Sequence, residues 1–222
     1  MLLMPALVLC GGAATAQTAD DLLGPIDRRM ALAETSLRAG ELQIAESRYR
    51  AAVFDAWMMT GALHVAAGRL AEARDAFRQA SHSAADADAA FRSLALVQMQ
   101  IGEPGEAVTI LTRLSLRAPK DLQSRRLLAQ ALAANGQPEE ALQTLEEAHA
   151  LAPDDAEVTF LLAAAYLQAR KTDAAERLFV EVAAARPIPQ TWVLIGRTYR
   201  GFHLFDQARA ALGKGPAQGP GT

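Results

Sequence analysis

The sequence predicts an all-α fold, a solenoid in which antiparallel helix pairs stack on one another. Two observations support this prediction. Hydrophobic residues make up 51% of the 222 residues, aromatic residues only 5%, and alanine is the commonest residue, a composition that favours closely packed helices over sheets. In addition, Pro119, Pro153 and Pro187 are spaced 34 residues apart, each after an alanine or arginine. A fixed interval of this length is typical of helical repeat proteins.

Each repeat is predicted to consist of a helix, a turn and a second helix. Gly68, Gly102 and Gly136 share the 34-residue interval, and each lies between two segments with helical apolar periodicity. Glycine ends a helix readily because it adopts left-handed backbone angles at little steric cost, and the proline stops the second helix. We therefore expect first helices before these glycines and second helices after them.

The first 25 residues are expected to precede the repeats. Residues 1–14 are mostly apolar and lead into the small residues between Ala14 and Ala16, a pattern typical of a signal peptide. Fourteen helical residues span about 21 Å, less than the roughly 30 Å of a bilayer core, so a signal peptide is favoured over an N-terminal membrane anchor. We predict a signal peptide over residues 1–16, a short leader over 17–25, and export to the periplasm or beyond.

The repeated residues resemble the tetratricopeptide repeat (TPR) family, in which a large residue, a glycine, an alanine and an aromatic residue recur at fixed offsets. The copy that starts at Phe54 has Trp57, Gly61, Ala73 and Phe77 at these offsets. The resemblance implies a right-handed superhelix. The copies start near residues 26, 54, 88, 122, 156 and 189 and together span 26–212. The residues expected to pack the helices together are Trp57, Gly61, Ala73, Phe77, Leu94, Ala107, Leu128, Ala141, Leu162, Tyr166, Ala175, Phe179, Trp192, Gly196, Tyr199 and Ala208.

The first copy is irregular, because it begins near Ile26, only 28 residues before the next. The six missing residues remove the loop between the two repeats. We therefore expect the helix from about Glu41 either to continue straight into the helix around Trp57 or to turn tightly near Val53 to Asp55.

Composition and spacing disfavour several classes of function. The formal net charge of −3 offers no basic surface to nucleic acid. The four histidines are widely separated and lack partners at metal-ligand spacing, and no nucleophile elbow or phosphate-binding loop is present. We therefore expect no metal, no cofactor and no enzymatic activity. His64 replaces a tyrosine of the family pattern and is expected to be a hydrogen-bonded core residue.

The resemblance also implies a site, because the first helices of such repeats line a concave groove that holds a segment of a partner protein. We expect Arg92 and Arg126 to bind carboxylates of that partner through two-pronged hydrogen bonds. The residues at the family's groove positions are Met58, Arg92, Met99, Gln100, Gln123, Arg126, Gln130, Phe160, Gln168, Arg197 and Arg200.

The last helix of the array is expected to end near Leu212, before a Gly- and Pro-rich tail over 213–222 that is predicted to be disordered. Leu204, Phe205, Ala208 and Leu212 would then form an exposed apolar edge.

Three functions remain open. The favoured one is a non-catalytic adaptor or scaffold in the bacterial cell envelope. The second is a regulatory or substrate-recruiting part of an enzyme whose catalytic domain lies elsewhere, and the third is self-assembly through the apolar edge.

Overall fold

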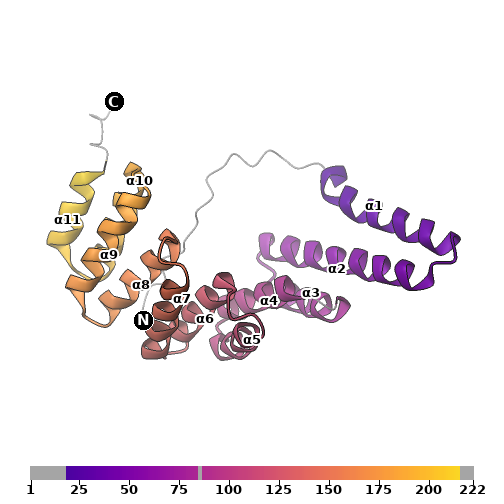
Figure 1. Ribbon diagram of the computed structural model, residues 1–222, viewed down its shortest axis with the longest axis horizontal. Helices are drawn as coiled ribbons and strands as arrows, with labels where there is room; N and C mark the ends of the chain where they lie inside the picture. The colour runs from indigo at the N-terminus through magenta and orange to yellow at the C-terminus, as the bar shows by residue number, and fades with distance from the viewer. Residues whose placement is uncertain (1–18, 85–86, 216–222) are drawn as a thin grey trace.

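The computed structural model describes residues 19–84 and 87–215, and within these residues all regular structure is helical (Figure 1). The predicted signal peptide at 1–16 and residues 216–222 of the predicted tail lie outside the described residues. The helices are α1 (Ala19–Arg38), α2 (Leu42–Ala66), α3 (Leu70–Ser83), α4 (Asp88–Ile101), α5 (Pro104–Arg117), α6 (Leu122–Ala134), α7 (Pro138–Leu151), α8 (Ala156–Gln168), α9 (Thr172–Ala185), α10 (Pro189–Gly201) and α11 (Phe205–Lys214).

The helices follow one another along an open arc, with α1 at one end and α11 at the other (Figure 1). Each first helix packs against the second helix that follows it, and α4, α6, α8 and α10 begin at Asp88, Leu122, Ala156 and Pro189. These are the residues at which the sequence pattern places the starts of four repeats. In Figure 1, α4 and α10 lie nearer the inside of the arc than α5 and α11. The fold is therefore the predicted all-α solenoid.

The long helix α2 joins two repeats. It runs for 25 residues without interruption, so that its first half pairs with α1 and its second half, from Phe54, pairs with α3. Continuation through Val53 to Asp55 is the first of the two expected arrangements, and the tight turn does not form. Since the repeat spacing lacks six residues here, there is no chain left to make a loop.

Two helix boundaries differ from expectation. Helix α1 begins at Ala19, so most of the predicted leader over 17–25 is helical, and α11 continues to Lys214 rather than ending at Leu212. The predicted boundaries mark the limits of the repeat pattern, whereas a helix continues as long as its backbone hydrogen bonds can form. Glycine permits this at Gly213, because it adopts helical angles as well as left-handed ones.

The turns inside the pairs share one backbone geometry. Gly68, Gly102 and Gly136 have φ angles of 72°, 94° and 78°, as their role as helix ends predicts. Arg170 and His203 take the same place in the last two repeats, with φ angles of 61° and 60°. A side chain makes these angles costly, so the last two turns are strained compared with the earlier ones.

Small residues bring paired helices close together, as expected. A Cβ atom placed on Gly196 would lie 2.6 Å from Cγ of Leu212, so α10 and α11 touch where the backbone is bare. Most of the predicted packing residues are buried. Tyr166 and Trp192 are half-buried, and Trp57 is an exception because 37% of it is exposed.

His64 differs from expectation. It is half-buried in the second half of α2, but its Nδ1 atom is buried without a hydrogen-bond partner among the described residues. The expected hydrogen bond at this ring nitrogen is therefore absent.

Among the described helices, none has both the length and the apolar character needed to cross a membrane.

Candidate functional site

The residues nominated for the groove lie on the second half of α2 and on α4, α6, α8 and α10. The structure divides them into three groups by exposure. Gln100, Gln123, Gln168, Arg197 and Arg200 are exposed; Met58, Arg92, Met99, Arg126 and Gln130 are half-buried; Phe160 is buried.

The apolar members of the set belong to the core rather than to the surface. Phe160 is only 8% exposed, and its ring centroid lies 5.4 Å from that of Phe179 on α9. Met58 and Met99 pack against buried residues of the neighbouring helices. These side chains therefore pack in the core beneath the nominated surface, and the accessible part of that surface is polar.

Arg92 is held by a carboxylate of its own chain. Its Nη1 atom lies 2.9 Å from Oδ2 of Asp121, the residue that caps α6 in the next repeat. The same carboxylate accepts hydrogen bonds from the hydroxyl of Ser124 (2.6 Å) and the backbone N–H of Gln123 (3.1 Å). Arg92 thus links two repeats, and a partner's carboxylate would have to displace Asp121 to reach it.

These contacts lower the pKa of Asp121. Burial would raise the pKa of this carboxyl group, but the hydrogen bond from Ser124, the charge of Arg92 and the N–H of Gln123 together hold its pKa below the ordinary value of an aspartate. The carboxylate of Asp121 is therefore ionised at neutral pH, and its charge is paired with that of Arg92.

Arg126 makes an equivalent link one repeat later. It forms an ion pair with Glu157, in the first turn of α8. A third ion pair, between Asp88 and Arg117, joins the two helices of the third repeat. The carboxylates that these two arginines bind in the structure belong to their own chain, so Arg92 and Arg126 connect successive repeats. Binding of a partner's carboxylates stays a prediction.

Arg197 and Arg200 differ from Arg92 and Arg126 in their exposure and in their ion pairing. Both are exposed on α10, three residues apart and hence on one side of the helix, and neither forms an ion pair with any residue in the described ranges. On α8, the preceding first helix, the exposed nominated residue is Gln168. We call Gln168, Arg197 and Arg200 the cationic end of the groove, the groove being the one that the sequence predicts. It is the part of the nominated surface with charge available to a partner.

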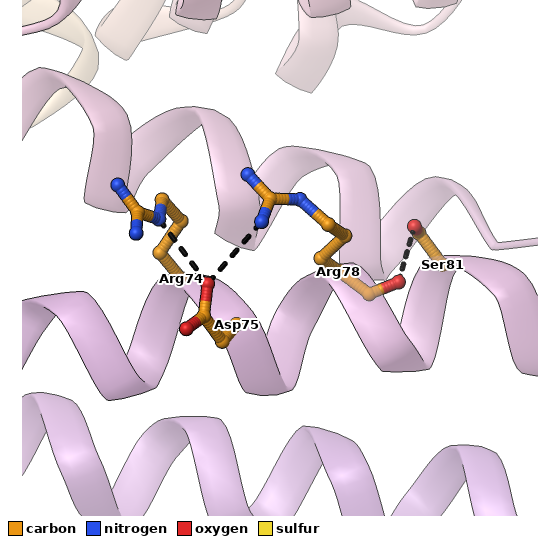
Figure 2. Close-up of polar contacts among 4 residues, drawn as sticks. All are labelled: Arg74, Asp75, Arg78 and Ser81. Carbon is orange, nitrogen blue, oxygen red and sulfur yellow. Dashed lines mark hydrogen bonds and ion pairs between the residues drawn. The ribbon is translucent and has the colours of Figure 1, made fainter.

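The second helix α3 carries a polar network of a different kind. On α3, Asp75 Oδ1 lies 3.3 Å from Nε of Arg74 and 3.2 Å from Nη1 of Arg78 (Figure 2). Ser81 donates a hydrogen bond of 2.7 Å to the carbonyl oxygen of Arg78. All of these contacts lie within one helix, so they stabilise α3 and do not join repeats.

Two hollows were not foreseen from the sequence. One, of about 590 Å³, lies between the end of α1, the first half of α2 and the end of α3 and is lined by Leu37, Leu42 and Tyr49 among others. The other, of about 310 Å³, lies between α9, α10 and α11 around Trp192 and Tyr199. Their existence depends on the spacing of helices from different repeats, which no local sequence pattern reports.

The described residues bring together no group of three or more His, Cys, Asp or Glu side chains that could hold a metal ion. The chemistry that the surface offers is hydrogen bonding and ion pairing, which suits recognition of another chain.

Comparison with known proteins agrees with this geometry. The TPR family model matches residues 64–131 and 132–190, which together make up more than half of the chain. The chain therefore belongs to the tetratricopeptide repeat family. No curated protein matches it significantly.

Several solved structures share the fold. TTC0263, a thermophilic TPR protein of Thermus thermophilus, is 23% identical, with a TM-score of 0.61 over 72% of this chain and 89% of that one. MamA is 21% identical, with a TM-score of 0.55 over 69% of this chain and 91% of that one. YrrB, a TPR protein with an unusual peptide-binding site, is 20% identical, with a TM-score of 0.52 over 77% of this chain and 94% of that one.

Proposed function

We propose that this protein is a non-catalytic scaffold that binds an acidic segment of another protein along its first helices. The observation that carries the proposal is the cationic end of the groove, where Arg197 and Arg200 are exposed and have no ion-pair partner among the described residues. Arginine side chains bind carboxylates in a two-pronged geometry, and the exposed glutamines of the other first helices can supply further hydrogen bonds.

The rest of the nominated surface suits an extended partner. Gln100, Gln123 and Gln168 are exposed on three successive first helices, and an amide can donate to and accept from the backbone of a bound peptide. The likeness to YrrB, which has a peptide-binding site, supports the same mode of recognition. The partner would lie across the repeats and end with its acidic residues at α10.

Site-specific photo-crosslinking tests this proposal. A photoreactive amino acid replaces one exposed glutamine at a time, at Gln100 or Gln168 on first helices and at Gln79 or Gln143 on second helices as matched controls. We expect one protein to be crosslinked, in native extract, from Gln100 and Gln168 and not from the controls. Crosslinking of that protein only from Gln79 or Gln143, or from no position, would contradict the proposal.

The proposal includes export to the cell envelope. Its support is the apolar stretch over 1–14 and the small residues that follow it, which are typical of a signal peptide. N-terminal sequencing of the protein purified from its native source tests this directly. A mature chain that begins at Gln17 is expected, and a chain that retains residues 1–16 in the cytoplasmic fraction would contradict export.

Self-association is a second candidate function, favoured by the exposed part of the apolar edge. Phe205 is 61% exposed and Leu212 is 41% exposed, whereas Ala208 is buried and Leu204 is half-buried. The edge is therefore smaller than the sequence predicts and consists mainly of the two larger side chains. A patch of this kind can join two copies of a chain.

A further inference from the structure

The hollow between α9, α10 and α11 has aromatic walls and a charged rim. Phe179, Trp192 and Tyr199 line it, and Glu176, Asp206 and Lys214 carry its charges. Its volume of about 310 Å³ is at the lower end of the range for ligand-binding pockets and is large enough for one long side chain. We call it the α9–α11 hollow.

An earlier repeat has an ion pair at the equivalent place. Arg125 on α6 occupies the repeat position of Trp192, and Glu147 on α7 occupies that of Lys214. There, Arg125 Nη1 lies 2.9 Å from Glu147 Oε2, and the arginine side chain is mostly buried. The last repeat replaces this ion pair by a tryptophan and a lysine, and a hollow lies around them.

The face of Trp192 is already a cation site. Nζ of Lys214 lies 4.6 Å from the centroid of the indole ring, within the range in which the ring quadrupole attracts a cation. Tryptophan gives the strongest attraction of this kind among the aromatic side chains. Lys214 is exposed and lies in the last turn of α11, so it is held at the ring by this contact and not by burial.

The remaining walls favour positive charge. Glu176 is exposed and forms no ion pair with any described residue, while Asp206 is paired with Arg209 at 2.9 Å. The ring of Tyr199 is fixed by an edge contact with Phe179, with centroids 5.2 Å apart. Burial and, secondarily, the charge of Glu176 raise the pKa of Tyr199 to about 12, so its phenol remains neutral at physiological pH.

We propose that the α9–α11 hollow binds a lysine or arginine side chain of a partner protein, with its cationic group on the face of Trp192 beside Glu176. Lys214 occupies this position in the free protein and swings into solvent when the partner's cation enters. The site differs from the predicted groove in the charge that it selects, and two of the three helices around it, α9 and α11, are second helices.

A fluorescence titration tests the proposal. The chain has two tryptophans, so the Trp57→Phe variant reports on Trp192 alone. The probe is a blocked pentapeptide of four alanines around a central arginine, and its neutral match has citrulline in place of the arginine. We expect a saturable change in Trp192 emission with the arginine peptide, with a dissociation constant on the order of millimolar, and none with the citrulline peptide.

Two further variants assign the response. Lys214→Met removes the internal competitor and should tighten arginine-peptide binding by about fivefold, while Glu176→Gln should weaken it by about threefold. Both residues are exposed, so the variants should fold, which circular dichroism checks. The reciprocal Trp192→Phe variant, which retains Trp57, should show no saturable change. An equal response to the two peptides, or an unchanged affinity in Lys214→Met, would overturn the proposal.

Discussion

Gly61 on α2 lies directly against the ring of Phe77 on α3. A Cβ atom placed on Gly61 would be 2.5 Å from Cε1 and 2.7 Å from Cδ1 of that ring, closer than a carbon atom can pack. The bare backbone of α2 is therefore what allows Phe77 to fill the space between the paired helices, and the ring is 5% exposed as a result.

Gly61→Ala should destabilise the protein. Alanine favours the helix by about 1 kcal/mol, but the added methyl group forces the ring of Phe77 or one helix to move, which costs about 1–3 kcal/mol. We expect a net loss of about 1 kcal/mol in the free energy of unfolding, measured by urea denaturation. Gly201→Ala is the matched control, because a Cβ atom there meets nothing within 4 Å, and it should not destabilise. Equal effects of the two changes would contradict this packing.

Arg170→Gly should stabilise the protein. Arg170 has a φ angle of 61°, and left-handed angles cost a non-glycine residue about 1 kcal/mol, a cost that glycine avoids. We expect a higher midpoint in thermal unfolding, and the reverse change at the equivalent turn, Gly136→Ala, should lower it. A lower midpoint for Arg170→Gly would show that its side chain makes contacts worth more than the backbone strain.

Asp121→Asn should weaken the link between the third and fourth repeats. Asparagine still caps α6 but has no charge with which to form an ion pair with Arg92. We therefore expect the free energy of unfolding to fall by about 0.5–1.5 kcal/mol at neutral pH. Because the pKa of Asp121 is lowered in the folded protein, its contribution is complete above about pH 4 and is lost as the pH falls through the folded pKa. The difference between wild type and variant should therefore shrink in acid.

Asp155→Asn controls for the cap in this experiment. Asp155 caps α8 in the same way, and it forms no ion pair with any side chain in the described part of the chain. Asp155→Asn should therefore lower the free energy of unfolding by less than Asp121→Asn does at neutral pH. A difference between wild type and Asp121→Asn that stays constant from neutral pH into acid would contradict the ionic account.

Phe205→Glu tests self-association. If the exposed edge joins copies of the chain, the average mass measured by light scattering should rise over a roughly hundredfold range of wild-type concentration and stay constant for the variant. Leu116→Glu is the matched control, since Leu116 is also exposed and apolar but lies on α5. A wild-type mass that does not change with concentration would remove this candidate function.

Most of the fold could be predicted because the repeat is a local pattern. Glycine and proline mark helix ends through their own backbone preferences, and a fixed interval between them places each pair. The spacing also predicted that a loop is missing between the first two repeats, but it left open whether α2 continues or turns tightly near Val53 to Asp55. The strained turns at Arg170 and His203 were not foreseen, because a non-glycine residue gives no local signal for a left-handed angle.

Less of the candidate site could be predicted. The sequence pattern assigned Arg92 and Arg126 to carboxylates of a partner, whereas in the structure both form ion pairs with carboxylates at the start of the next repeat. Arg92 and Asp121 are 29 residues apart, a separation at which only the stacking of repeats brings them together. The two hollows depend in the same way on helices from different repeats, and for that reason no sequence pattern indicated them.

The affinity of the crosslinked partner for two charge-reversed variants tests the central claim most directly. The first variant is Arg197→Glu with Arg200→Glu; the second is Arg113→Glu with Arg177→Glu, which makes the same change in charge on exposed residues of α5 and α9. Isothermal titration should show at least about tenfold weaker binding for the first variant and nearly unchanged binding for the second. Equal affinities for the two variants would show that the cationic end of the groove does not bind the partner.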